Sequence, residues 1–253
     1  QLTATAGQAY GEKHAAKREG LPGVGVWEPT PYMRSLPGLL DHLRVELGDE
    51  VELLHDVHQR LSPNQAAGLA REVEKYHLFF LEDAVGPEFR EGLSLVRATS
   101  TTPLAIGELF TETSACVGVI RDRLTDYIRC DLGHVGGITA GRKIAALAEP
   151  FGVRTAWHGP PDLSPVGHAA TVHLDLATSN FGIQEWWPHA EHKEGDKIQQ
   201  VFKGGVVRRE AWLDVPATAG LGIEVEEAAA RSYPYKRGYL PVVRRQDGSV
   251  WPW

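Results

Sequence analysis

Six residues with chemically useful side chains recur along this sequence at nearly constant intervals. Each ends a short apolar run, and successive members are 26, 26, 21, 29 and 27 positions apart. They are Asp56, Glu82, Glu108, Arg129, His158 and Glu185. One strand, loop and helix of an eight-stranded α/β barrel takes about 30 residues, and the carboxyl ends of its strands all meet at one mouth. The spacing therefore predicts one pocket with four carboxylates, an arginine and a histidine.

The first three members of the series could hold a divalent cation. Asp56, Glu82 and Glu108 offer the hard oxygen donors that Mg²⁺ binds in octahedral geometry. Three carboxylates on neighbouring strands repel one another unless a cation lies between them. Each could instead stabilise only the N-terminus of the helix that follows it. Their common spacing favours a single Mg²⁺ site.

His58 follows Asp56 by two positions, so both side chains point the same way if the strand continues. A histidine beside a metal-bound substrate is suited to general acid or base chemistry. The alternative is an exposed loop histidine. His55 alternates with Asp56 along the strand, and we expect it to be structural.

The later members of the series suit an anionic, hydroxyl-rich ligand. Arg129 and His158 can donate hydrogen bonds to a carboxylate or a hydroxyl group. The tight loop after His158 would aim Asp162 at the same mouth. Arg129 could instead form a structural ion pair with Asp126 or Asp131, and that interpretation stays open.

The elements that position these residues alternate along the chain. Six apolar runs predict strands at 51–56, 78–82, 103–108, 126–129, 153–158 and 181–185. Leucines at helical spacing predict a helix over 36–47. Ser62-Pro63 and Ser164-Pro165 are typical helix starts, and Thr139 is expected to cap a helix that runs to Ala148. Strand–helix alternation with short connections implies parallel strands.

Composition limits the class of protein. The chain has 253 residues, 42% of them hydrophobic, and a net charge of −7, which argues against nucleic acid as a partner. It carries no apolar stretch long enough to span a bilayer. We expect Cys116 and Cys130 to be reduced core residues of a cytoplasmic protein.

We expect an active-site loop region at 1–34, which contains Tyr10, barrel units at 35–187 and a C-terminal tail at 188–253. A closed barrel of this kind needs eight strands and only six are visible. We therefore expect an N-terminal portion of the protein to be absent from this chain. On sequence alone, Tyr10 is an ordinary surface tyrosine.

Several short motifs together resemble the enolase superfamily, and within it the mannonate dehydratase subgroup. They are 53–58 (LLHDVH), 81–84 (LEDA), 107–108 (GE), 126–129 (DYIR), 158–159 (HG) with 162–165 (DLSP), and 180–185 (NFGIQE). The resemblance covers essentially the whole chain. It implies a modified TIM-type (β/α) barrel, here strands three to eight plus the tail, without the N-terminal α+β capping domain.

The resemblance also implies an activity: Mg²⁺-dependent dehydration of D-mannonate, D-gluconate or both to 2-keto-3-deoxy-D-gluconate. Asp56, Glu82 and Glu108 would bind Mg²⁺. Tyr10 would remove the C2 proton, and His58 would protonate the departing 3-hydroxyl. The sugar acid would be held by His58, Glu108, Arg129, His158, Asp162 and Glu185. We expect a homo-oligomer with a small acid sugar as its ligand.

Two other functions stay open. One is a racemase or cycloisomerase of the same superfamily, which a His–Asp dyad would favour; Asp131 is the candidate partner of His158. The other is a catalytically idle regulatory protein that binds a sugar acid, since a fold alone does not establish activity.

Overall fold

The computed structural model describes residues 25–189, 195–236 and 243–251, and Tyr10 lies outside them. The chain divides into two compact units. Unit 1 comprises residues 1–104 and 237–253, and unit 2 comprises residues 105–236. Among the described helices, none combines the length and apolarity needed to cross a membrane.

Asp56 and Glu82 end two strands of a parallel sheet whose strand order is β2-β3-β4-β5-β6. Its strands are β2 (Leu54–Asp56), β3 (Phe80–Glu82), β4 (Leu104–Ile106), β5 (Tyr127–Ile128) and β6 (Arg154–Thr155). They confirm the first five predicted strands, although each is shorter than its apolar run. The sixth prediction is wrong: Phe181 forms only an isolated parallel bridge with Thr155. The α/β class with parallel strands is confirmed.

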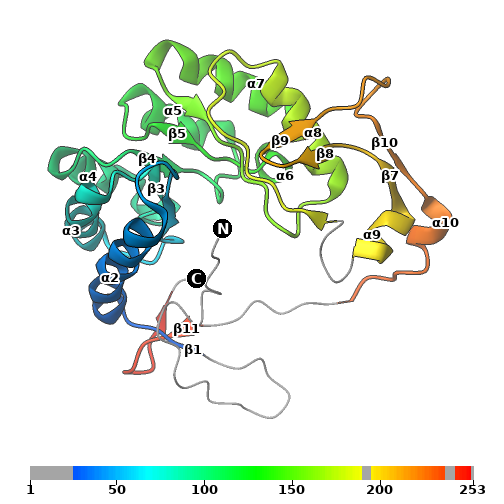
Figure 1. Cartoon of the computed structure of the whole chain (residues 1–253). Coiled ribbons are helices and arrows are strands. Elements are labelled where there is room, and N and C mark those ends of the chain that lie inside the picture. Colours follow the sequence, from blue (N-terminus) through cyan, green and yellow to red (C-terminus); the bar gives the residue numbers. More distant parts are fainter. Residues whose placement is uncertain (1–24, 190–194, 237–242, 252–253) are drawn as a thin grey trace. The chain divides into compact units, whose positions relative to one another are not determined.

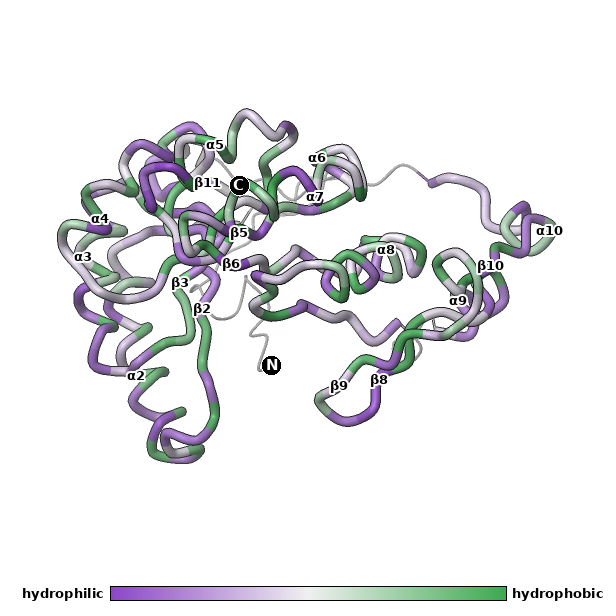
Figure 2. Tube along the Cα trace, turned by 90° about the horizontal axis from the view of Figure 1, so that it is seen from above, coloured by the Kyte–Doolittle hydropathy of each residue, from purple (hydrophilic) through white to green (hydrophobic). Residues whose placement is uncertain are grey.

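Unit 1 places helices beside its strands. They are α2 (Pro29–Leu47), α3 (Pro63–Val73) and α4 (Leu93–Thr99), and α3 packs beside α4 (Figure 1). Helix α2 buries Tyr32, Leu36 and Leu40 along one face, and its trace alternates between hydrophilic and hydrophobic residues (Figure 2). It begins at Pro29, so the expected loop over 1–34 is wrong at its end. Proline at the first helical position needs no N–H partner, which explains the earlier start.

Unit 1 also contains a small three-stranded sheet in the order β1-β11-β12. Its members are β1 (Gly25–Val26), β11 (Val243–Arg244) and β12 (Val250–Trp251). β1 pairs with β11 in parallel, and β11 pairs with β12 in the antiparallel sense. This sheet joins the two ends of the described chain within one unit.

Two predicted helix starts are confirmed. Gln65 Oε1 accepts a hydrogen bond from the Ser62 backbone N–H at 3.1 Å, which is the reciprocal half of a capping box before α3. Ser164 Oγ accepts from the Gly167 N–H at 3.2 Å and caps α8 (Pro165–Leu176). Both sets of partners lie within three residues, so the sequence alone contains the signal.

Three further helices of unit 2 are α5 (Thr113–Arg121), α6 (Leu132–Val135) and α7 (Gly137–Ala148). Helix α7 packs beside both α5 and α8 (Figure 1). The predicted cap at Thr139 is wrong. Gly136, with φ at 108°, is the N-cap of α7, and its left-handed conformation lets α7 follow α6 directly.

The tail of unit 2 forms short antiparallel pairs. It comprises α9 (Gly195–Val201), β7 (Phe202–Gly204), β8 (Val207–Arg209), β9 (Trp212–Asp214), β10 (Ile223–Val225) and α10 (Glu227–Ala230). β8 pairs with β9 and β7 with β10. β8 and β9 thus form a hairpin. Helix α10 begins only at Glu227, because residues 223–225 pair with β7.

The two cysteines lie in the core of unit 2 as free thiols, which agrees with their expected reduced state. Cys116 is in α5 and Cys130 follows β5, and their sulfur atoms are 3.4 Å apart.

Candidate active site

In unit 1, two carboxylates lie at the ends of neighbouring parallel strands. Asp56 and Glu82 are register partners, each the last residue of its strand. Glu82 is buried and Asp56 is partly exposed. Because neighbouring strands are only about 4.8 Å apart, the two carboxylates start from adjacent backbone positions.

The chain turns sharply directly after these strand ends. His58, Gln59 and Asp83 all have positive φ, at 58°, 62° and 39°. Non-glycine residues adopt this left-handed region uncommonly, and such residues cluster at functional sites. β2 ends at Asp56, as predicted, so the strand does not continue to His58 and its alternation does not set the direction of the His58 side chain.

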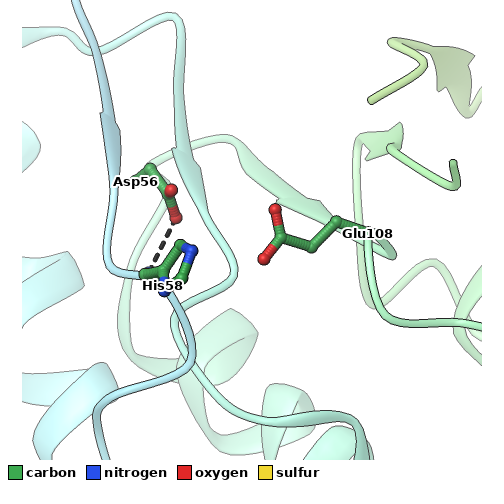
Figure 3. A group of neighbouring side chains, drawn as sticks. All are labelled: Asp56, His58 and Glu108. Atoms are coloured by element: carbon green, nitrogen blue, oxygen red, sulfur yellow. Dashed lines mark hydrogen bonds between the residues drawn. The ribbon is translucent and has the colours of Figure 1, made fainter. Parts of the chain in front are cut away.

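The turn nevertheless holds His58 against Asp56. The backbone N–H of His58 donates to Asp56 Oδ1 at 2.7 Å, and the two side chains lie next to each other (Figure 3). This bond fixes the carboxylate of Asp56 through the backbone of the same loop. Glu108, also labelled in Figure 3, comes from the loop after β4 and belongs to unit 2.

Gln59 and Asp83 join the two loops of unit 1, and the sequence analysis missed both. Gln59 N donates to the Asp83 carbonyl at 2.7 Å, and its side-chain Nε2 donates to Asp83 Oδ2 at 3.0 Å. Both residues are buried. Their positions directly after His58 and Glu82 were the available signal.

His55 is structural, as expected. Its Nε2 lies 2.6 Å from the Tyr32 hydroxyl of α2. Burial lowers the pKa of His55 to about 4, so the ring is neutral near pH 7.

In unit 2, a glycine delivers Glu108 from the end of β4. Gly107 has φ at 135°, and a Cβ there would lie 3.2 Å from the Cys130 backbone nitrogen and 3.3 Å from its sulfur. A side chain at this position would be both strained and crowded. Gly107 therefore lets the chain pass close to the end of β5 before it presents Glu108, which is buried.

Arg129 and Glu185 form an ion pair between the ends of two predicted strands. Arg129 Nη2 donates to Glu185 Oε2 at 2.8 Å, and Nη1 donates to the Ala156 carbonyl at 3.0 Å. Gly159 N also donates to Glu185 Oε2, at 2.7 Å. Burial opposes ionisation of Glu185, yet the charge of Arg129 and the Gly159 N–H hold its pKa below the usual value.

His158 lies between two carboxylates. Its Nε2 is 3.2 Å from Glu108 Oε2, and its Nδ1 is 3.1 Å from Asp131 Oδ2. Burial opposes ionisation of Asp131, but hydrogen bonding to His158 and the neighbouring histidines hold the Asp131 pKa below its usual value. His134 lies in α6 with its Nδ1 3.0 Å from the Glu108 carbonyl oxygen.

The remaining candidates differ in how the structure places them. Asp162 is exposed in the turn before α8. Tyr10 lies outside the described residues. Gly159, the residue after His158, lies against the backbone of Glu185. A Cβ at this position would collide with the Glu185 carbonyl oxygen. The structure thus brings Glu108, Arg129, His158 and Glu185 together in unit 2, and Asp56, His58 and Glu82 in unit 1.

The family can be stated from these observations and from sequence comparison. The family described as enolase C-terminal domain-like matches residues 30–229. The chain belongs to this family.

Relatives and a solved structure narrow the similarity. The chain is 45% identical over 233 residues to a D-mannonate dehydratase of Caulobacter sp. strain K31. The aligned residues cover 92% of this chain and 57% of the relative. It is 43% identical over 243 residues to a D-galactonate dehydratase family member of Chromohalobacter salexigens. That alignment covers 96% of this chain and 59% of the relative.

A crystal structure of an enolase from Pantoea ananatis with bound D-gluconate and Mg is also similar. Its TM-score is 0.86 at 43% identity, and the match covers 94% of this chain and 56% of that chain. The chain therefore spans less than two thirds of the length of the relatives that it matches.

Proposed function

We propose that this chain carries the catalytic part of a Mg²⁺-dependent lyase that dehydrates a sugar acid. The substrate is D-mannonate, D-gluconate or both, and the product is 2-keto-3-deoxy-D-gluconate. The observation that carries the proposal is the placement of acidic residues at the ends of three consecutive parallel strands. Asp56 ends β2, Glu82 ends β3, and Glu108 lies in the loop directly after β4. The similarity to named dehydratases and to an enolase with gluconate and Mg supports it.

The donor set fits the cation. Asp56, Glu82 and Glu108 supply only carboxylate oxygens, which are the ligands that Mg²⁺ prefers. Asp56 and Glu82 start from register-paired backbone positions, so two of the three ligands are adjacent within one unit. When bound, Mg²⁺ would act as a Lewis acid that stabilises negative charge developing on the substrate carboxylate.

The protein's own residues divide the remaining tasks. Tyr10 removes the C2 proton and His58 delivers a proton to the leaving 3-hydroxyl. Arg129, which is already held by Glu185, presents its guanidinium to the sugar acid, and His158, Asp162 and Glu185 bind its hydroxyl groups. A fixed guanidinium loses less side-chain entropy when it binds a carboxylate than a mobile one does.

A screen of acid sugars with Mg²⁺, scored for 2-keto-3-deoxy product, tests the proposal. We expect product from D-mannonate, D-gluconate or both, and loss of product when a chelator removes Mg²⁺ or when Asp56 is replaced in Asp56→Asn. Absence of product from all acid sugars, or turnover that survives chelation, would contradict it.

One observation favours a second candidate, a racemase or cycloisomerase of the same superfamily. Asp131 contacts His158 Nδ1 at 3.1 Å, so the chain does contain a His–Asp pair. If His158 were the base of such an enzyme, a reaction in deuterium oxide would place deuterium on the carbon that is inverted by a racemase or joined in the ring by a cycloisomerase. The acid would lose no water. Loss of water with formation of the 2-keto-3-deoxy acid distinguishes the dehydratase.

A further inference from the structure

Two loops of unit 1 are hydrogen-bonded to each other beyond the ends of β2 and β3. The Val57 N–H donates to the Glu82 carbonyl at 3.0 Å. The Gln59 N–H donates to the Asp83 carbonyl at 2.7 Å, and Gln59 Nε2 donates to Asp83 Oδ2 at 3.0 Å. We call the side-chain pair of Gln59 and Asp83 the clamp. It joins the loop that carries His58 to the loop that follows Glu82.

The clamp is buried directly beside residues of the candidate site. Gln59, which follows His58, is 9% exposed. Asp83, which follows Glu82, is 1% exposed. Burial of polar side chains is costly unless they are hydrogen-bonded. Removal of either side chain takes a buried hydrogen bond from the other and should weaken the connection between the two loops.

The clamp lies on a turn with an unusual backbone. His58, Gln59 and Asp83 have φ at 58°, 62° and 39°, and none of them is glycine. Such conformations cost free energy and persist only where the surrounding structure holds them. Beyond the clamp, Arg60 and Val85 pair in an antiparallel bridge. The turn is therefore held from the end of β2 to this bridge, with the clamp between them.

This turn decides where the imidazole of His58 lies. Because β2 ends at Asp56, the direction of the His58 side chain follows from the backbone of the turn. The turn places His58 next to the Asp56 carboxylate, whose Oδ1 accepts from the His58 N–H at 2.7 Å (Figure 3). A displacement of about 1 Å at a reacting group can lower a rate about 100-fold. A relaxed turn would keep every site residue and still misplace the imidazole.

We propose that Gln59 and Asp83 are a pair of positioning residues that hold the imidazole of His58 in place beside the Asp56 carboxylate. Their effect on turnover rests on the proposed function, in which His58 protonates the departing hydroxyl group. Their effect on the turn does not rest on that function.

Three variants remove or keep the clamp without adding strain to the turn. Gln59→Asn retains an amide but is one methylene shorter, so it does not reach Asp83. Asp83→Gly deletes the acceptor, whereas Asp83→Asn keeps an oxygen that can accept from Gln59 Nε2. Glycine and asparagine adopt positive φ more readily than most residues, so these variants test the side chains and not the backbone.

Thr102→Val is the matched control in unit 1. Thr102 Oγ1 donates a buried hydrogen bond to the Ala70 carbonyl at 2.8 Å. Thr102 lies before the start of β4, at the opposite edge of the parallel sheet from the ends of β2 and β3. Its replacement by valine removes a comparable hydrogen bond away from His58.

Hydrogen exchange of the Val57 and His58 backbone N–H groups, followed by NMR without substrate, measures the turn directly. In Gln59→Asn and Asp83→Gly, exchange should be faster by about 3- to 10-fold, the range for loss of one buried hydrogen bond. Asp83→Asn and Thr102→Val should stay within about twofold of the wild type, because loops open locally. Unchanged exchange in both variants that delete the clamp, or an equal increase in Thr102→Val, would overturn the proposal.

The two steps of the proposed reaction separate positioning of His58 from a general loss of folded protein. With an accepted sugar acid, Gln59→Asn and Asp83→Gly should lower kcat for dehydration by about 10- to 100-fold. Exchange of the C2 proton with solvent should change by less than about threefold, because that step does not use His58. Thr102→Val should leave both rates within about twofold, since its hydrogen bond contributes to stability alone. Asp83→Asn should restore most of the dehydration that Asp83→Gly loses.

Wild-type kcat in both variants that delete the clamp would overturn the positioning of His58. A loss of C2 exchange as large as the loss of dehydration would overturn it as well. If the wild type itself converted no sugar acid, the dehydratase proposal would fall instead. Hydrogen exchange would still decide the role of the clamp in that case, because it uses no substrate.

Discussion

The two units hold their candidate residues in different ways. In unit 1, Asp56 is fixed by a backbone N–H two residues away, in a loop of left-handed residues. In unit 2, Arg129 and Glu185 are 56 positions apart, and His158 and Asp131 are 27 apart, and side-chain charges join them. Backbone geometry thus orders the candidate residues of unit 1, and a charge network orders those of unit 2. Removal of a charge should accordingly disturb unit 2 more than unit 1.

The histidines of the two units give the largest expected difference. His58→Asn should abolish dehydration but leave exchange of the C2 proton with solvent, because only loss of the 3-hydroxyl needs the acid. His158→Asn should mainly raise KM. The loss for His58→Asn should be about 10²- to 10⁴-fold, as for other general acids. Product assays and NMR of deuterium exchange measure both steps.

Tyr10→Phe is the matched comparison, since it should abolish both turnover and exchange. Unchanged dehydration in His58→Asn would refute the assignment. Loss of exchange in His158→Asn would support the racemase instead.

The charge network of unit 2 should show the next largest effect. Arg129→Met leaves Glu185 without the cation that holds its pKa low. We expect the free energy of unfolding, measured with urea, to fall by about 3 kcal/mol, as for other broken buried pairs. Arg209→Met breaks the exposed pair with Asp214, whose side chains are 75% and 51% exposed, and should cost less than about 1 kcal/mol. Equal losses would mean that the buried pair contributes no more to stability than the exposed pair.

Replacement of a glycine by alanine should change the free energy of unfolding in opposite directions in the two units. Gly159→Ala in unit 2 brings a Cβ against the Glu185 carbonyl oxygen and should lower the free energy of unfolding by about 1–3 kcal/mol. Gly38→Ala in unit 1 lies in α2 with nothing within 4 Å of the added Cβ. It should raise the same quantity by about 0.4–1 kcal/mol. A stabilising Gly159→Ala would contradict the tight approach of the His158 loop to Glu185.

The smallest expected difference between the two units is in how their stability depends on pH. Burial lowers the pKa of His55 in unit 1 and of His168 in unit 2 to about 4. In the unfolded chain both histidines take up a proton near their ordinary pKa of 6.5, but in the folded protein they do so only near 4. The free energy of unfolding should therefore fall as the pH falls from 6.5 toward 4, in either unit.

Unit 2 adds Asp175, whose pKa burial raises to about 8. Its folded form keeps a proton that the unfolded chain releases above pH 3.8, so stability falls as pH rises from 4 to 8. Asp175→Asn should raise Tm by roughly 5 °C at pH 8 and by much less at pH 4. Equal shifts at the two pH values would contradict a shifted carboxyl group.

The sequence predicted features that depend on a few neighbouring residues. The caps at Ser62 and Ser164 and the strand ends at Asp56 and Glu82 follow from short patterns, and the structure confirms them. The start of α2 at Pro29 and of α7 at Gly137 were missed, because the apolar period and Thr139 gave competing local signals.

The network of unit 2 was predicted only in part. The spacing indicated that Arg129, His158 and Glu185 meet, but it did not indicate which side chains pair. Asp131 was a possible partner of Arg129 and also of His158, and the structure pairs it with His158 through the loops after β5 and β6. Gln59 and Asp83 were missed because their hydrogen bond depends on two turns with left-handed residues. No glycine at these positions indicates such a turn in the sequence.

The left-handed residues after β2 and β3 also constrain attempts to redesign the protein. At positions 58, 59 and 83, glycine and asparagine adopt positive φ with little strain, whereas β-branched residues do not. A combinatorial library that varies these loops should therefore exclude valine, isoleucine and threonine there. Variants chosen only for side-chain size or polarity would fail because of the backbone, and such failures would say nothing about substrate choice.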